Sequence, residues 1–275
     1  MRRPVAFFIS AAVLSVPSLS AAQATDSTRS RRRPPVITWL DAGVLGAGLA
    51  GSIAIMGADE RIARRLQSER YQSKKGWQDV ADVAGKVNEK SLFAAALVTY
   101  GVAKLFDAPR TTTDIAWHTT ESIFVASATA TVIRGALGRS RPFVTADSNA
   151  YDYHPGKGFA ELAYRAYPSI HAAAAFATAS ALTAETAQHS RRAAFVVGPI
   201  AYTAAALPGL ARMYGDKHWA SDVMMGAALG AVSGWATVRF HHHRPNNKMD
   251  RIFIGTIPTP VVANGGLGMM WGLEF

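Results

Sequence analysis

Long Ala- and Gly-rich apolar segments of helical character follow one another through most of the chain, from about residue 39 to residue 240. Small side chains let helix backbones approach closely, and no strand-like alternation interrupts these segments. We therefore predict an all-α helical bundle of about six to seven helices. The predicted helices are residues 39–57, 60–72, 76–106, 114–137, 169–188, 192–211 and 219–240.

The two ends of the chain differ from this body. Arg2 and Arg3 precede a short apolar core, and Ala22 and Ala24 place small residues where signal peptidase cleaves, which predicts an export signal. We assign residues 1–24 to a signal peptide, 25–35 to a basic linker, 36–240 to the helical domain and 241–275 to a C-terminal extension. The extension has no helical period, so we expect it to be irregular or β-like. The protein is then exported, to the periplasm or to the envelope membrane.

The composition favours a membrane-associated or heavily buried helical protein, because charged residues make up only 17% of the chain. The uncharged stretches 166–184 and 193–211 approach the ~20 residues that a membrane-spanning helix needs. The first contains His171 and the second contains Pro199 and Pro208, so both also fit buried helices. The sequence leaves open whether the protein spans a membrane or is a soluble or peripheral bundle, and it defines no oligomeric state.

The net charge of +10 indicates an anionic partner. No nucleic-acid-binding motif accompanies this charge, so we expect no nucleic acid. A phosphorylated lipid, an anionic membrane surface or a small phosphomonoester fits instead. The chain has no cysteine, which excludes disulfides, thiolate metal sites and thiol nucleophiles.

Three polar clusters lie where an apolar helical protein should avoid polar groups. They are residues 134–142 (RGALGRSRP), 168–171 (PSIH) and 212–222 (RMYGDKHWASD). A single arginine at a helix end usually complements the helix dipole, and a single histidine is usually a core residue. The conjunction of three clusters, all at predicted helix ends, indicates instead that they converge on one cleft.

The basic and small residues of these clusters suit a bound phosphate. Arg134, Arg141 and Arg212 carry permanent charges and planar donors that match phosphate oxygens. Ser169 is a natural N-cap, so the free N–H groups of Ser169, Ile170 and the following residue would point at an anion.

The two histidines of the clusters supply reactive groups. His218 and Asp222 are four residues apart, so they share one face of a helix. The carboxylate can hold the imidazole in one tautomer and leave the other nitrogen free to attack. His171 is then the candidate general acid for the leaving oxygen.

The clusters resemble, in order, the three motifs of the type 2 phosphatidic acid phosphatase (PAP2) superfamily, which includes class A acid phosphatases and vanadium haloperoxidases. Those motifs are Lys-x6-Arg-Pro, Pro-Ser-Gly-His and Ser-Arg-x5-His-x3-Asp, and the resemblance covers roughly residues 90–240. It implies that His218 is the nucleophile, Asp222 its orienting partner and His171 the proton donor. It also implies phosphate binding by side chains and one main-chain N–H, with no metal and no cofactor. The implied phosphate-binding residues are Arg134, Arg141, Ser169, Ile170 and Arg212.

The chain departs from those motifs at three positions. Arg134 replaces Lys, which keeps the charge but changes its geometry, and Ala211 replaces Ser outside the reacting groups. Ile170 replaces Gly, and its β-branched side chain is expected to narrow the pocket and alter specificity before it removes activity.

The resemblance predicts a metal-independent phosphohydrolase that cleaves a phosphomonoester or a lipid (pyro)phosphate through a phosphohistidine intermediate. Two alternatives stay open: a vanadate-dependent haloperoxidase that uses the same pocket, and a non-catalytic envelope protein that binds anionic lipid. The run His241–His243 could bind a metal ion, but Arg244 and Pro245 follow it, and we interpret it as a polar helix end.

Overall fold

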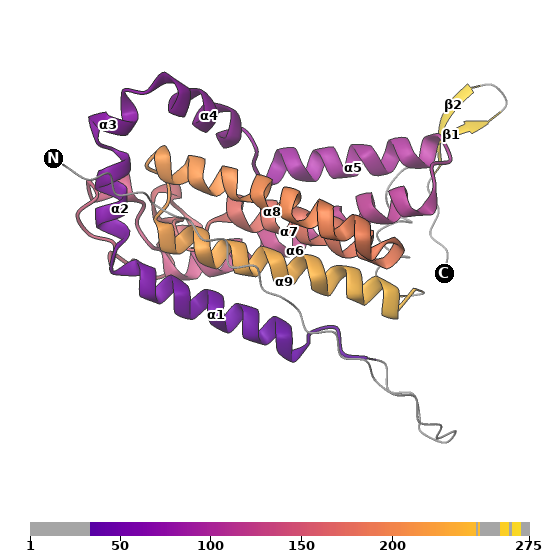
Figure 1. Cartoon of the computed structure of the whole chain (residues 1–275), viewed down its shortest axis with the longest axis horizontal. Coiled ribbons are helices and arrows are strands. Elements are labelled where there is room, and N and C mark those ends of the chain that lie inside the picture. The colour runs from indigo at the N-terminus through magenta and orange to yellow at the C-terminus, as the bar shows by residue number, and fades with distance from the viewer. Residues whose placement is uncertain (1–33, 246, 248–258, 264–265, 271–275) are drawn as a thin grey trace, which may run out of the picture. The chain divides into compact units, whose positions relative to one another are not determined.

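The structure is a computed structural model that describes residues 34–245, 247, 259–263 and 266–270 (Figure 1). The predicted signal peptide, residues 1–24, lies outside the described residues, as does all of the predicted linker except residues 34 and 35. Parts of the C-terminal extension also lie outside them.

The described part of the chain is all-α apart from one short hairpin, which confirms the predicted fold class. The α-helices are α1 (Trp39–Met56), α2 (Asp59–Leu66), α3 (Glu69–Gln72), α4 (Lys75–Gly85), α5 (Glu89–Leu105), α6 (Arg110–Leu137), α7 (Ile170–His189), α8 (Arg191–Tyr214) and α9 (Ala220–His243). Three 3₁₀ helices lie between α6 and α7: η1 (Pro142–Val144), η2 (Lys157–Phe159) and η3 (Leu162–Tyr164). In the extension, β1 (Thr259–Ala263) pairs antiparallel with β2 (Gly266–Met270), in agreement with the β-like tail expected from the sequence.

Two of the predicted helices are each divided into two, which is why the bundle has more helices than expected. The predicted helix 60–72 is interrupted at Ser68, whose extended backbone separates α2 from α3. The predicted helix 76–106 is interrupted before α5, because the side chain of Asn88 accepts hydrogen bonds from the N–H groups of Lys90 and Ser91. Such an N-cap favours a new helix start over continuation. At the other end of the bundle α9 continues to His243, three residues past the expected limit of the helical domain.

Helix α7 is the centre of the bundle and packs against α6, α8 and α9 (Figure 1). Glycines let α9 approach the α7 backbone directly: a Cβ on Gly230 would lie 2.2 Å from the carbonyl oxygen of Ala173. At Gly226 it would lie 2.4 Å from the carbonyl oxygen of Ser169. This close packing joins the first turns of the two helices, where the N–H of Ser169 donates to the carbonyl oxygen of Asp222 at 2.9 Å.

Three described helices, α1, α8 and α9, are long and apolar enough to cross a membrane. Helix α8 contains the predicted stretch 193–211, whereas the stretch 166–184 falls mainly on the buried α7. The outward faces of α1 and α8 expose large apolar side chains, among them Ile53, Phe195 and Ile200. A bundle with a polar exterior would not present such faces to water.

Candidate active site

His218 lies in the turn between α8 and α9, two residues before α9 begins, and its ring is buried. The Nδ1 atom of His218 is 3.5 Å from Oδ2 of Asp222, in the first turn of α9. Burial lowers the pKa of His218, against the opposite effect of Asp222. The imidazole is therefore neutral at neutral pH, as a nucleophile requires. Neither ring nitrogen has a hydrogen-bond partner within the described residues.

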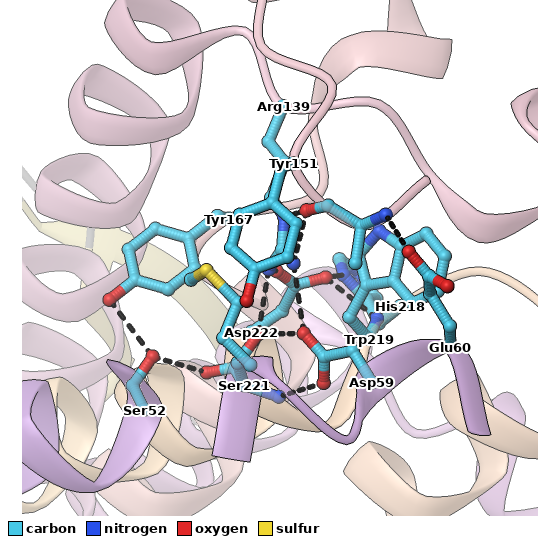
Figure 2. Close-up of polar contacts among 12 residues, drawn as sticks. Ser52, Asp59, Glu60, Arg139, Tyr151, Tyr167, His218, Trp219, Ser221 and Asp222 are labelled. Carbon is cyan, nitrogen blue, oxygen red and sulfur yellow. Dashed lines mark hydrogen bonds and ion pairs between the residues drawn. The ribbon is translucent and has the colours of Figure 1, made fainter. Parts of the chain in front are cut away.

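Asp222 is held in place by groups other than His218 (Figure 2). Its Oδ1 accepts a hydrogen bond from Nη1 of Arg139 at 2.5 Å, and its Oδ2 accepts one from the N–H of Trp219 at 2.7 Å. The buried Arg139 also donates to Oδ2 of Asp59 at 2.8 Å, and Asp59 in turn accepts from the N–H of Ser221 at 3.0 Å. Arg139 thus ties α2 and the segment after α6 to the first turn of α9.

Sequence reasoning missed most of this support. Arg139 and Ser221 belong to the first and third polar clusters, but neither received a role. Asp59 is separated from Arg139 by 80 residues, so no local spacing connects the two. Asp59 begins the short segment 59–66, and an acidic residue at the start of such a segment is common on solvated helices, so nothing in the sequence distinguished it.

Three arginines approach the two histidines from different elements. Arg134 is in the last turn of α6, Arg212 is in the last turn of α8, and Arg141 directly precedes η1. Burial and then the nearby charges of Arg212 and Arg134 lower the pKa of Arg141 to about 10, because both disfavour its charged form. The Nε atom of each arginine is buried without a hydrogen-bond partner within the described part of the chain.

The N-terminus of α7 points into the same region. Ser169 is fully buried and caps α7, its Oγ accepting from the N–H of Ala172 at 3.4 Å. Ile170 begins α7, and its side chain packs in the core beside Ala126 and Leu229. The side chain is thus accommodated in the core, which argues against the expected narrowing of the pocket, while the first N–H groups of the helix stay available to an anion.

His171 completes the group. The centroid of its ring is 6.2 Å from that of His218. Burial and then the charge of Arg212 lower the pKa of His171 to about 3, with smaller effects from the other cations around it. Its Nδ1 atom is 4.0 Å from Oε2 of Glu89, the first residue of α5. Glu89 was not predicted, because it falls inside what the sequence presented as one continuous helix at 76–106.

The structure therefore gathers the predicted residues in one site. A neutral histidine beside a carboxylate, a second histidine and three arginines come from separate parts of the chain. Such a site is suited to hold a phosphoryl group and to attack it with an imidazole nitrogen.

The fold and the site can be compared with those of known proteins. Residues 115–246 match the model of the PAP2 superfamily, the superfamily whose motifs the three polar clusters resemble. The match includes all three polar clusters.

Two known proteins resemble the chain more specifically. The fold is similar to the crystal structure of a transmembrane PAP2-type phosphatidylglycerolphosphate phosphatase from Bacillus subtilis, with a TM-score of 0.56 and 17% sequence identity over 77% of this chain and 99% of that one. A lipid A 1-phosphatase from Porphyromonas gingivalis is 42% identical over 72 residues, which are 26% of this chain. The match spans 15% of the length of that relative.

Proposed function

We propose that the protein is a phosphohydrolase that cleaves a lipid phosphate through a phosphohistidine on His218. The observation that carries this proposal is the arrangement of side chains, in which a buried, neutral imidazole lies near three arginines whose Nε donors have no partner in the described residues. A phosphoryl group would satisfy those donors and balance their charge.

The reaction proceeds in two steps. Nε2 of His218 attacks phosphorus, while Asp222 holds the proton on Nδ1, so a P–N bond forms as the P–O bond to the leaving group breaks. The leaving oxygen takes a proton from His171. In the second step His171 accepts a proton from water, whose oxygen displaces His218 and releases inorganic phosphate. The arginines and the N-terminus of α7 stabilise the charge on the transferring group throughout.

The low pKa of His171 has a consequence for its role as an acid. In the free protein the imidazole is neutral, because burial and the surrounding cations disfavour the imidazolium. A bound phosphate dianion cancels the charges of those cations and raises this pKa. Glu89, 4.0 Å from Nδ1, favours the protonated form in the same direction. Substrate binding thereby favours protonation of His171, which then donates the proton that the leaving group requires.

A lipid substrate is favoured by an apolar pocket of 670 Å³ enclosed by α4, α5, α7 and α8. Its lining begins one helical turn from the phosphate site: Leu92 follows Glu89, Ala175 follows His171, and Pro208 precedes Arg212. An acyl chain could enter this pocket while its phosphate stays among the arginines. The three apolar helices and the lipid-phosphatase names of the two relatives support the same substrate class and an association with a membrane.

The pocket does not suit a catalytic divalent cation. Three arginine charges would repel one, and the carboxylate of Asp222 is already engaged by Arg139 and by the N–H of Trp219. We therefore expect turnover to persist in EDTA. The export predicted from residues 1–24 is part of the proposal, and a mature protein that begins at Thr25 would support it.

The test is phosphate release by the purified full chain in detergent and EDTA, with phosphatidic acid, lipid A and a soluble aryl phosphate as substrates. The His218→Ala variant is measured alongside. Release from a lipid that vanishes in the variant supports the proposal. Release from the aryl phosphate alone would refute the lipid substrate but keep the chemistry. No release from any substrate would refute the phosphatase, and vanadate-dependent bromide oxidation would then identify the haloperoxidase alternative.

A further inference from the structure

A further group of polar side chains, separate from the three sequence clusters, lies inside the bundle and away from the phosphate site. It consists of His118 on α6, Glu185 on α7 and His242 on α9. Glu185 follows His171 by fourteen residues on the same helix, which places the two about 21 Å apart along the helix axis. The cluster is therefore separate from the groups that would bind phosphate.

The donor atoms of the cluster lie close enough together to contact one ion. Glu185 is completely buried, and its carboxylate contacts Nδ1 of His118. Both of its oxygens lie 3.1 Å from Nε2 of His242. One ligand atom from each of the three residues lies within 4.8 Å of the others. Bonds of about 2.0–2.2 Å from nitrogen and oxygen to one ion would place the donor atoms at comparable separations.

A second carboxylate lies next to the cluster. The ring of His118 stacks on that of His241 with centroids 4.0 Å apart, and Nε2 of His241 contacts the carboxylate of Glu121. Two carboxylates thus lie in one region of the bundle, each in contact with imidazole rings.

We propose that His118 Nδ1, His242 Nε2 and the carboxylate of Glu185 bind a divalent transition-metal ion, with Zn²⁺ as the best-suited ion. Two imidazoles and one carboxylate are ligands that zinc uses, whereas magnesium and calcium prefer oxygen alone. The ion joins α6, α7 and α9 at this end of the bundle, and the Glu121–His241 pair supports the ligand His118 from outside. Its role is to stabilise the fold rather than to take part in the phosphate chemistry.

This site revises the interpretation of the His241–His243 run as a polar helix end. Only His242 of the run belongs to the proposed ligand set. The other two proposed ligands are His118 and Glu185. No spacing in the sequence joins these positions, so the run alone did not indicate a site. The side chain of His242 is 32% exposed, which leaves a path for an ion to enter.

The experiment measures metal content and thermal unfolding of the full chain, purified without a histidine tag. We expect about one zinc ion per chain after reconstitution. We also expect the unfolding temperature to rise by about 5–10 °C when zinc is 100-fold above its dissociation constant, and to fall again in chelator. A wild-type protein that binds no zinc and whose unfolding temperature ignores both additions overturns the proposal.

Matched variants locate the site. His242→Ala should weaken zinc binding by more than about 100-fold, whereas His243→Ala, at the adjacent exposed residue outside the cluster, should leave it unchanged. Equal loss in the two variants would assign the metal to the histidine run and overturn the site. Cobalt-substituted wild type gives a measurement that does not depend on how a variant folds. Intense visible bands of tetrahedral coordination support the ligand set, and the weak spectrum of hydrated cobalt contradicts it.

Discussion

Helices α6, α7 and α9 contribute residues both to the phosphate site and to the His118–Glu185–His242 cluster. These two sites differ in the sign of their excess charge. At the N-termini of α7 and α9 the phosphate site gathers three arginines, and its buried donors have no partners within the described residues. At the other end of the bundle, Glu185 and His242 near the C-termini of α7 and α9 meet His118 from the N-terminal part of α6, and their carboxylate and imidazole groups are paired with one another.

The difference follows the direction of α7 and α9, whereas α6 and α8 run the opposite way and bring Arg134 and Arg212 to the phosphate site at their C-termini. The N-terminus of a helix carries partial positive charge and the C-terminus partial negative charge, so α7 and α9 favour an anion at one end and a cation at the other. The arginines and carboxylates add to this polarity rather than oppose it. Opposite ends of one bundle are thus prepared for ligands of opposite charge.

The largest expected difference in activity is between a histidine substitution at one end of the bundle and one at the other end. We expect His218→Ala to lower kcat/KM by at least about 10⁴-fold, because it removes the nucleophile. His243→Ala, on an exposed ring at the other end, should leave turnover unchanged. Both variants are assayed by phosphate release in the same detergent. Comparable turnover in wild type and His218→Ala would end the proposed mechanism.

The next largest effect concerns the partner of the nucleophile. Asp222→Asn keeps the size of the side chain but removes the charge that selects the tautomer of His218, and we expect kcat to fall by about 10³-fold. Thermal unfolding measured on the same sample separates this effect from loss of fold. A folded variant with a kcat within a few-fold of wild type would show that Asp222 does not orient the imidazole.

Arg139 and Arg141, only two residues apart, should behave in opposite ways. Arg139→Met removes the partner of Asp59 and Asp222, and we expect the free energy of unfolding to fall by about 3–5 kcal/mol. Arg141→Met removes a cation whose nearest charged neighbours include Arg212 and Arg134, so stability should hold while activity is lost. Denaturant unfolding and phosphate release measure the two effects. Equal destabilisation by both would contradict the division between support and substrate binding.

The close packing that joins the two ends gives a smaller effect. Gly230→Ala places a methyl group against the carbonyl of Ala173, and we expect it to cost about 1–3 kcal/mol of stability. Gly101→Ala on α5 is the control, because a Cβ there meets nothing within 4 Å, and it should be neutral or slightly stabilising. Unfolding temperatures provide the comparison. A tolerated Gly230→Ala would mean that α9 can withdraw from α7 without loss.

The smallest effect is a displacement of the pH profile. Burial holds the pKa of His218 below its ordinary value of 6.5, so the reactive neutral form persists to lower pH than for a free imidazole. As pH falls through this lowered pKa, the ring gains a proton and loses the nitrogen lone pair that attacks. The acidic limb of kcat/KM should therefore have its midpoint below 6.5. A midpoint above that value would show that Asp222 outweighs burial.

Much of the bundle was predictable because helical periodicity and breakers are local properties. The divisions at Ser68 and Asn88 were missed because a polar residue in a helical pattern serves equally as a surface position or as a cap. The hairpin in the extension matched the expected β-like tail, since a run without helical period and rich in β-branched residues favours strands.

The candidate site was predictable where its residues form motifs and unpredictable where they meet only in space. His218, His171 and the arginines lie in three short clusters with recognisable spacing. The contacts of Asp59 with Arg139, of Glu89 with His171 and within the His118–Glu185–His242 cluster are between residues far apart in sequence. Each of these residues alone resembles an ordinary polar helix residue. Their partners follow from the packing of α2, α5, α6, α7 and α9, which no local pattern encodes.

The covalent intermediate is the most direct test of the mechanism. Wild-type protein is mixed with a phosphorylated substrate, quenched in base within the first turnover, and analysed by peptide mass spectrometry. The account predicts a phosphoryl group on the peptide that contains His218 in wild type, and none in His218→Ala. Turnover with no phosphopeptide in wild type, or a phosphoryl group on another residue, would contradict it.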